Sequence, residues 1–317
     1  MSTAVQQATS QSVATESQLA VAYSVCRSIT RAAATNFYYA FLVLPKRKRQ
    51  ALNAVYAFMR RCDDIADDAS VPVPERRQKL DLWLNAFHRA QAGQPTDDPV
   101  LLALTDSQRR HGIPPDLLDQ LAYGTAMDLT EELDESLGSG TTGRTPLVHY
   151  QTFEDLYRYC YYVASVVGLV CIRVFGYRDR AAEALAERCG LAFQLTNIIR
   201  DVREDAIIGR VYLPQQDLAK FGVSPSALSS TAPDPTHYRP LLAMEAQRAR
   251  EFYRAGDALI PLVEEDSQPA LWVLLTIYRR LLDKIESRRY DVFSGKVALS
   301  TREKLVILGK GFLKRLA

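Results

Sequence analysis

Helical spacing of the apolar residues is the feature that most narrows the folds open to this 317-residue chain. From Leu19 onward, apolar residues recur every three or four positions, which is the repeat of an amphipathic helix, whereas the strict alternation of a strand is nearly absent. Hydrophobic residues make up 47% of the chain and charged residues 24%, so such helices can bury a large core. The pattern therefore predicts an all-α protein.

Breaks in this pattern separate helices but not domains. Proline and glycine mark the ends of the periodic segments, yet no internal repeat and no long flexible linker divides the chain. We expect a polar, disordered tail over residues 1–17, without the features of a signal peptide, and one helical domain over residues 18–317. Helices are expected near 45–62, 75–92, 152–176, 179–208, 237–263, 268–287 and 301–316, with irregular stretches at 134–145 and 209–235.

Charge and cysteine content exclude several classes of protein. The formal net charge is only +2, which gives nucleic-acid binding no electrostatic support. Five cysteines lie far apart and form no CxxC pair, which predicts reduced thiols in a cytoplasmic protein rather than a disulfide framework or a zinc site. The longest apolar run, residues 163–174, is too short to span a bilayer.

Two aspartate pairs have the spacing of neighbours on one face of a helix. Asp63 and Asp67 are four residues apart near one helix end, and Asp201 and Asp205 have the same spacing on a later helix. Such carboxylates lie about 6 Å apart along the axis, and their repulsion costs roughly a few tenths of a kcal/mol unless a cation relieves it. Because hard oxygen ligands favour Mg²⁺, with Mn²⁺ as the alternative, the pairs are predicted metal ligands.

Polar residues and arginines surround both pairs. Gln194 and Asn197 precede Asp201 by seven and four residues, so they extend its polar face along the helix. An acidic run at a helix end is most often a solvated surface. Two runs with matching spacing and neighbouring arginines instead favour a site in which metal ions and guanidinium groups hold a diphosphate. The arginines are Arg60, Arg61, Arg200, Arg203 and Arg210.

Longer stretches around these residues resemble the signatures of the squalene/phytoene synthase family. The resemblance extends from about Leu19 to the C-terminus. The matching stretches are NFYYAFLVLP from Asn36, YAFMRRCDDIADD from Tyr56, YCYYVASVVG from Tyr159, QLTNIIRDVREDA from Gln194, GRVYLP from Gly209 and IYRRLLDKIE from Ile277.

The resemblance implies an isoprenoid-synthase fold, a single large helical domain around a central cavity, in which the two D-x-x-x-D motifs face each other and bind Mg²⁺. The implied metal ligands are Asp63, Asp67, Asn197, Asp201 and Asp205. The residues implied to bind substrate diphosphate are Asn36, Arg60, Gln194, Arg200, Arg210 and Tyr278. The residues implied to surround the reaction centre are Phe37, Phe41, Tyr56 and Tyr159.

Three positions depart from the family pattern. Ala34 stands where serine is frequent, which removes one hydroxyl near the phosphates. Arg203 stands where glycine is common, and Ile208 stands where arginine is common. None of these departures alters the aspartates, so the metal prediction is unchanged.

The implied reaction is the head-to-head condensation of two prenyl diphosphates. The stretch VGLVCIRVFG over 167–176 favours two farnesyl diphosphates giving presqualene diphosphate, with NADPH required only if the reaction continues to squalene. The alternative is a phytoene synthase that joins two geranylgeranyl diphosphates. A non-catalytic assembly factor of the same fold is expected to have lost aspartates, whereas this chain keeps both pairs, so we discount it. A di-iron bundle is rejected because it needs Glu-x-x-His, and none of the four histidines has a glutamate three residues before it.

The C-terminal segment bears on membrane contact. Residues 302–315 are basic and amphipathic, which predicts either peripheral contact with a lipid surface or, more commonly, a last helix packed on the core. The sequence sets no oligomeric state.

Overall fold

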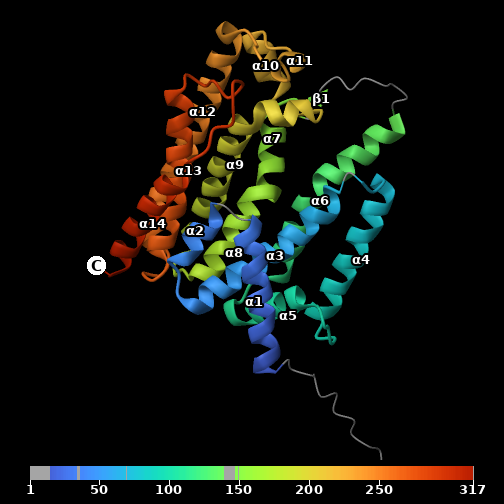
Figure 1. The fold of residues 1–317 in the computed structure, drawn as a ribbon, viewed down its shortest axis with the longest axis vertical. Coiled ribbons are helices and arrows are strands. Elements are labelled where there is room, and N and C mark those ends of the chain that lie inside the picture. Colours follow the sequence, from blue (N-terminus) through green and yellow to red (C-terminus); the bar gives the residue numbers. More distant parts are fainter. Residues whose placement is uncertain (1–14, 34–35, 69, 139–146, 149, 317) are drawn as a thin grey trace, which may run out of the picture.

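Helices form nearly all the regular structure (Figure 1). The structure is a computed structural model that describes residues 15–33, 36–68, 70–138, 147–148 and 150–316. The predicted all-α class is confirmed. The helices are α1 Glu16–Ala33, α2 Phe37–Leu42, α3 Lys46–Ala66, α4 Val73–Gln91, α5 Pro99–His111, α6 Pro115–Gly138, α7 Phe153–Cys160, η1 Tyr161–Ser165, α8 Val166–Phe175, α9 Ala181–Ile207, α10 Gln215–Phe221, α11 Pro225–Leu228, α12 Pro235–Leu259, η2 Ile260–Leu262, α13 Gln268–Ser287 and α14 Thr301–Leu316.

Local sequence signals account for several helix boundaries. Thr152 Oγ1 accepts a hydrogen bond from the backbone N–H of Asp155 at 3.3 Å, and Asp155 Oδ2 accepts one from the backbone N–H of Thr152 at 3.0 Å. This is the predicted capping box, and it begins α7. Asp98 caps α5 through its carboxylate. Gly176 ends α8 with φ of 77°, a conformation that residues with a side chain rarely adopt.

The layout places three helices in the middle of the molecule. Helices α3, α8 and α9 lie between α12, α13 and α14 on one side and α4, α5 and α6 on the other (Figure 1). Helix α9 packs on α12, η1 and α8, while α3 packs on α1 and α5. The approach of α9 to η1 is close, because a Cβ atom at Gly190 would lie 2.6 Å from the carbonyl oxygen of Ala164.

Three stretches differ from the sequence-based expectation. The helix predicted over 152–176 contains a π-helical turn, η1, which inserts extra backbone and shifts the apolar repeat. The stretch predicted as irregular over 209–235 contains α10, α11 and the strand β2 Arg210–Val211, which pairs in parallel with β1 Leu147–Val148.

The third difference is at the end of α6. This helix continues to Gly138, so the first part of the predicted 134–145 loop is helical, as its helix-compatible residues allow. The remainder of that loop lies outside the described residues, as do Ala34 and residues 1–14 of the predicted tail. Helix α1 begins at Glu16, slightly before the predicted domain boundary.

Two surfaces bear on the membrane prediction. Within the described ranges, one helix, Phe153–Phe175, is long and apolar enough to cross a membrane by length and composition, and half of its most apolar window is buried in the molecule. This helix is longer than the apolar run at 163–174 because it begins at Phe153, ten residues before that run. Peripheral contact through α14 stays a prediction. The large apolar side chains exposed on α14 are Leu305, Val306, Phe312 and Leu313.

Candidate active site

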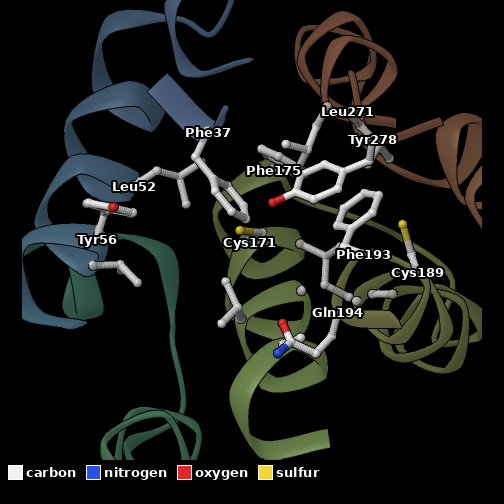
Figure 2. A pocket seen from close by; sticks show the side chains of 18 of the residues that line it. Phe37, Leu52, Tyr56, Cys171, Phe175, Cys189, Phe193, Gln194, Leu271 and Tyr278 are labelled. Atoms are coloured by element: carbon white, nitrogen blue, oxygen red, sulfur yellow. The ribbon is translucent and has the colours of Figure 1, made fainter. Parts of the chain in front are cut away.

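A mainly apolar cavity of about 210 Å³ lies among α2, α3, α8, α9 and α13 (Figure 2). Its polar side chains come from four residues, Tyr56, Gln194, Asn197 and Tyr278. Most of its wall is aliphatic or aromatic, which suits a hydrocarbon chain. The large apolar residues of the wall are Phe37, Phe41, Leu52, Val55, Met59, Val163, Val167, Ile172, Phe175, Phe193, Leu259, Leu271 and Leu274.

Both aspartate pairs lie just beyond the cavity on the helices that wall it. On α3 the wall runs from Leu52 to Met59, and Asp63 follows one helical turn later. On α9 the wall runs up to Asn197, and Asp201 again follows one turn later. We call this end of the cavity, with its two aspartate pairs, the acidic end.

The hydroxyl of Tyr278 connects the cavity to the acidic end. Burial raises the pKa of Tyr278, while the nearby Arg200 guanidinium and hydrogen bonds with the side chains of Asn197 and Asn36 lower it, and the net pKa is raised. Asn36 is the residue before α2, yet its side chain makes no capping bond to that helix. Its amide is therefore available to the tyrosine, and their predicted roles in binding diphosphate and metal stay predictions.

Arginine and carboxylate side chains are paired at the acidic end. Arg200 Nε donates to Asp201 Oδ1 at 2.7 Å, and Arg200 Nη2 donates to Asp201 Oδ2 in a second bond. Burial lowers the pKa of Arg200, but Asp201 opposes this and the net pKa is raised. Arg60 pairs with Asp64 at 2.6 Å, and both side chains are about half exposed. Such charge-assisted pairs restrain the orientation of both guanidinium groups.

The donor set fits a hard divalent cation. Asn197 Oδ1 is buried and accepts no hydrogen bond from any described residue, although Asn197 Nδ2 donates to Gln194 Oε1 at 3.5 Å. An unsatisfied buried acceptor costs about 1–3 kcal/mol, which a metal ion would relieve. Within the described part of the chain, no three Asp, Glu, His or Cys side chains form a complete metal cluster. Metal binding by the two aspartate pairs stays a prediction, and Mg²⁺ commonly takes only one or two carboxylates from a protein.

Several aromatic side chains, Tyr278 among them, lie close together in the wall of the cavity. The ring of Phe37 lies 6.0 Å from that of Phe41, 6.5 Å from that of Tyr56 and 6.3 Å from that of Tyr278. All four residues line the cavity, and Figure 2 shows Phe37, Tyr56 and Tyr278 directed into it from different elements. Aromatic faces stabilise a passing carbocation by about 0.5–2 kcal/mol each.

Phe193 and Lys304 are two candidate residues that the sequence analysis missed. Phe193 lines the cavity and stacks on Tyr278 with ring centroids 4.4 Å apart. Its position four residues before Asn197 on one helix face was the available signal. Lys304 Nζ lies 5.7 Å from the centroid of the Tyr39 ring, and burial followed by the Arg200 charge lowers the pKa of this lysine. Lys304 follows the family signatures, so no motif marks it.

Besides the predicted residues already described at the acidic end, Tyr159 and Arg210 also do not line the cavity. Tyr159 is buried with its ring 5.0 Å from that of Tyr212 and 5.4 Å from that of Tyr150. Arg210 belongs to β2, where it pairs with Leu147. Their roles in catalysis and diphosphate binding stay predictions.

Comparisons with known proteins bear on the family and fold of the chain. The model of the squalene/phytoene synthase family matches residues 30–303. The chain is 35% identical to the 15-cis-phytoene synthase of Synechococcus elongatus, over 93% of this chain and 94% of that protein. It is 36% identical to the phytoene synthase of Mycobacterium tuberculosis, over 89% and 88%. Among solved structures, a dehydrosqualene synthase has a TM-score of 0.80 and 30% identity, covering 93% of this chain and 96% of that one.

Proposed function

The chain belongs to the squalene/phytoene synthase family, whose members condense prenyl diphosphates head to head, and we propose that its own reaction joins two geranylgeranyl diphosphates to give phytoene. The observation that carries this choice is the similarity to two proteins named phytoene synthases, at 35% and 36% identity over about nine-tenths of the chain. The sequence analysis favoured farnesyl diphosphate and presqualene diphosphate. The relatives support its alternative better, and we adopt that alternative.

The acidic end supplies the groups that would hold the diphosphates. Asp63, Asp67, Asn197, Asp201 and Asp205 would bind Mg²⁺. When bound, Mg²⁺ supplies positive charge to the oxygens of the leaving diphosphate.

Neighbouring residues orient the substrate. Arg200 is fixed by its two bonds to Asp201 and presents positive charge next to Tyr278. The tyrosine hydroxyl, held by Asn36 and Asn197, can position a diphosphate oxygen.

The cavity wall protects the reactive intermediate from water. Ionisation of an allylic diphosphate leaves a carbocation that water would quench, so the chain must lie in an apolar space. Phe37, Phe41 and Phe193 provide apolar and aromatic surface there without a nucleophilic atom. The proposed reaction has two stages. One diphosphate ionises, the cation adds to the second chain and a proton is lost; the second diphosphate then leaves, the skeleton rearranges and a second proton is lost. None of these steps consumes a reductant, so NADPH is not required.

The test is a product assay. Purified protein with Mg²⁺ is given C15 or C20 prenyl diphosphate, with and without NADPH, and products are identified by mass. We expect phytoene from the C20 substrate without reductant. Efficient conversion of the C15 substrate to presqualene diphosphate or squalene, with little turnover of the C20 substrate, would show that the farnesyl prediction was right.

A further inference from the structure

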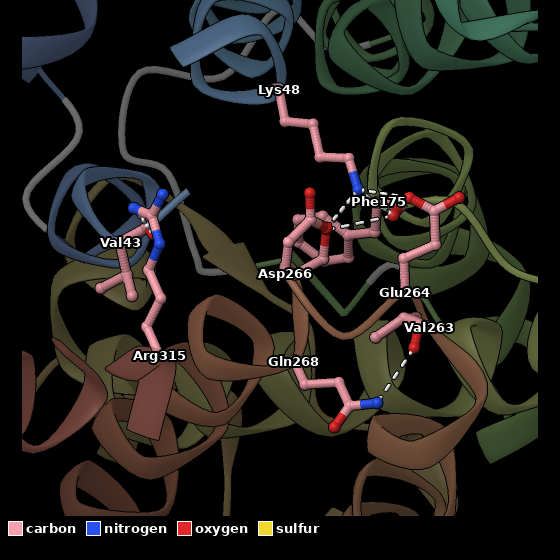
Figure 3. A network of polar contacts seen from close by, with 9 residues as sticks. Val43, Lys48, Phe175, Val263, Glu264, Asp266, Gln268 and Arg315 are labelled. Atoms are coloured by element: carbon pink, nitrogen blue, oxygen red, sulfur yellow. Dashed lines mark hydrogen bonds and ion pairs between the residues drawn. The ribbon is translucent and has the colours of Figure 1, made fainter. Parts of the chain in front are cut away.

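Lys48, near the start of α3, contacts the end of α8 and the segment that precedes α13 (Figure 3). Its three ammonium hydrogens are shared among four oxygens within hydrogen-bond distance of Nζ: the carbonyl oxygen of Phe175 at 2.7 Å, Glu264 Oε2 at 2.7 Å, Asp266 Oδ1 at 2.5 Å and Ser267 Oγ at 2.9 Å. We call this group the Lys48 clasp. The lysine side chain is 12% exposed, whereas those of Glu264 and Asp266 are 54% and 45% exposed, so the cation is buried beneath two carboxylates that water still reaches.

Three members of the clasp, Lys48, Phe175 and Ser267, belong to the cavity wall or lie one helical turn from it. Leu52 follows Lys48 by one helical turn on α3 and lines the cavity. Phe175 lines it directly. Leu271 follows Ser267 by one turn on α13 and also lines it. One ammonium group therefore connects the walls contributed by α3, α8 and α13.

Ser267 adds a second link within the clasp. Its hydroxyl is fully buried and lies 3.0 Å from the carbonyl oxygen of Phe175, within hydrogen-bond range. The loop that begins α13 is thus connected to the last residue of α8 both directly and through Lys48. Separation of Phe175 from Leu271 would break several hydrogen bonds at once.

The clasp lies at the end of the cavity remote from the aspartates. On α3, fifteen residues separate Lys48 from Asp63, which corresponds to about 22 Å of helix. On α13, the order is Ser267, Leu271 and then Tyr278 at the acidic end. A substrate with its diphosphate near Tyr278 would direct the tail of its hydrocarbon chain toward the clasp.

We propose that the Lys48 clasp sets the longest prenyl chain that the cavity accepts. This rests on the proposed function for the identity of the substrate. The clasp holds Leu52, Phe175 and Leu271 at a fixed separation, so the depth available to the chain is fixed. Without the ammonium, the carboxylates of Glu264 and Asp266 repel each other and the carbonyl of Phe175 keeps only the Ser267 hydroxyl as a donor, so this end of the cavity can open.

The test variant is Lys48→Met, which keeps the methylene stem and lacks the charge. We measure kcat/KM for C15, C20 and C25 prenyl diphosphates, together with the dissociation constants of the corresponding non-reacting thiodiphosphates. We expect the preference for C25 over C20 to rise at least about fivefold, because chain-end discrimination in apolar pockets is of this order, while kcat for C20 stays within about twofold.

The control is Arg250→Met, which removes a comparable ion-pair group away from the cavity. Arg250 Nη2 contacts Asp283 Oδ1 at 2.7 Å and Arg250 Nε contacts Glu286 Oε1 at 2.9 Å, and none of the three lines the cavity. We expect a lower Tm and unchanged chain-length preference. Asp266→Asn, a milder change within the clasp, should shift the preference in the same direction as Lys48→Met but by less.

The outcomes distinguish failure of the chain-length inference from failure of the proposed function. If Lys48→Met and Asp266→Asn lower Tm but leave the C25 to C20 ratios of turnover and affinity unchanged, or if Arg250→Met shifts them equally, the clasp is only structural and the inference is overturned. If the wild-type protein converts none of the substrates, the proposed function fails. The thiodiphosphate affinities then still decide whether the clasp sets chain length.

Discussion

At the scale of single residues, Tyr278 shows how the acidic end depends on side chains from separate elements. Its ring packs between Phe37 and Phe193, while its hydroxyl meets Asn36 and Asn197. In the proposed complex, the residue would border the prenyl chain and the diphosphate at once. A polar group placed at the boundary of an apolar cavity positions the reacting bond without admitting water.

The aspartates give the first prediction at this scale. Asp63→Asn and Asp201→Asn should each reduce kcat by at least about 100-fold, because each removes a carboxylate that would bind Mg²⁺. Steady-state rates at saturating Mg²⁺ check this. Asp81→Asn is the matched control, since Asp81 is half exposed, pairs with Arg77 and does not line the cavity, and it should keep near-normal turnover. Near-normal rates in Asp63→Asn or Asp201→Asn would contradict the metal assignment.

At the scale of elements, a buried charge cluster joins α10 to α12. Glu245 is fully buried, and Arg248 Nη1 donates to its two carboxylate oxygens at 2.8 Å. The same nitrogen donates to Asp217 Oδ2 at 3.1 Å. Burial raises the pKa of Glu245 to about 7, and the charge of Arg248 only partly opposes this. The packing of these two helices therefore depends on the protonation state of Glu245.

This link predicts a pH dependence of stability. Because the pKa of Glu245 is about 7 in the folded protein and 4.5 for an ordinary glutamate, the folded state binds more protons than the unfolded state between those values. The free energy of unfolding should thus fall as pH rises from about 4.5 to about 7. Relative to Glu245→Gln, the wild type should lose up to about 3 kcal/mol over this range in urea denaturation. If the free energy of unfolding changes with pH in the same way in the wild type and in Glu245→Gln, protonation of Glu245 does not contribute to stability.

At the scale of the whole molecule, the fold brings together two helices from opposite halves of the chain. Helix α3 carries Asp63 and helix α9 carries Asp201, and both wall one cavity. A metal-bound diphosphate between them would connect the two halves. Binding should therefore stabilise the complete domain rather than one element.

Thermal unfolding checks this expectation. A non-reacting C20 thiodiphosphate should raise Tm only when Mg²⁺ is present, with a stabilisation of about 2.7 kcal/mol at one hundred times its dissociation constant. Addition of EDTA should abolish the shift, and so should Asp63→Asn in the presence of Mg²⁺. An equal shift with EDTA would mean that arginines alone bind the diphosphate.

The sequence alone was enough to predict the features that depend on nearby residues. The capping box at Thr152, the aspartate pairs and the α13 boundaries at Gln268 and Ser287 follow from spacings of three or four residues. The family resemblance and the all-α class rest on such local patterns too, and both are confirmed.

Only the tertiary structure decided which side chains share a space. Tyr159 matches a family motif, yet it packs on Tyr150 and Tyr212 rather than lining the cavity. Lys48 meets Asp266 across more than two hundred residues. Helical periodicity shows which face of a helix is buried but not what that face meets, because the partner is set by the packing of distant elements. Cavity depth is such a property, and for that reason the stretch over 167–176 alone could not determine the substrate chain length.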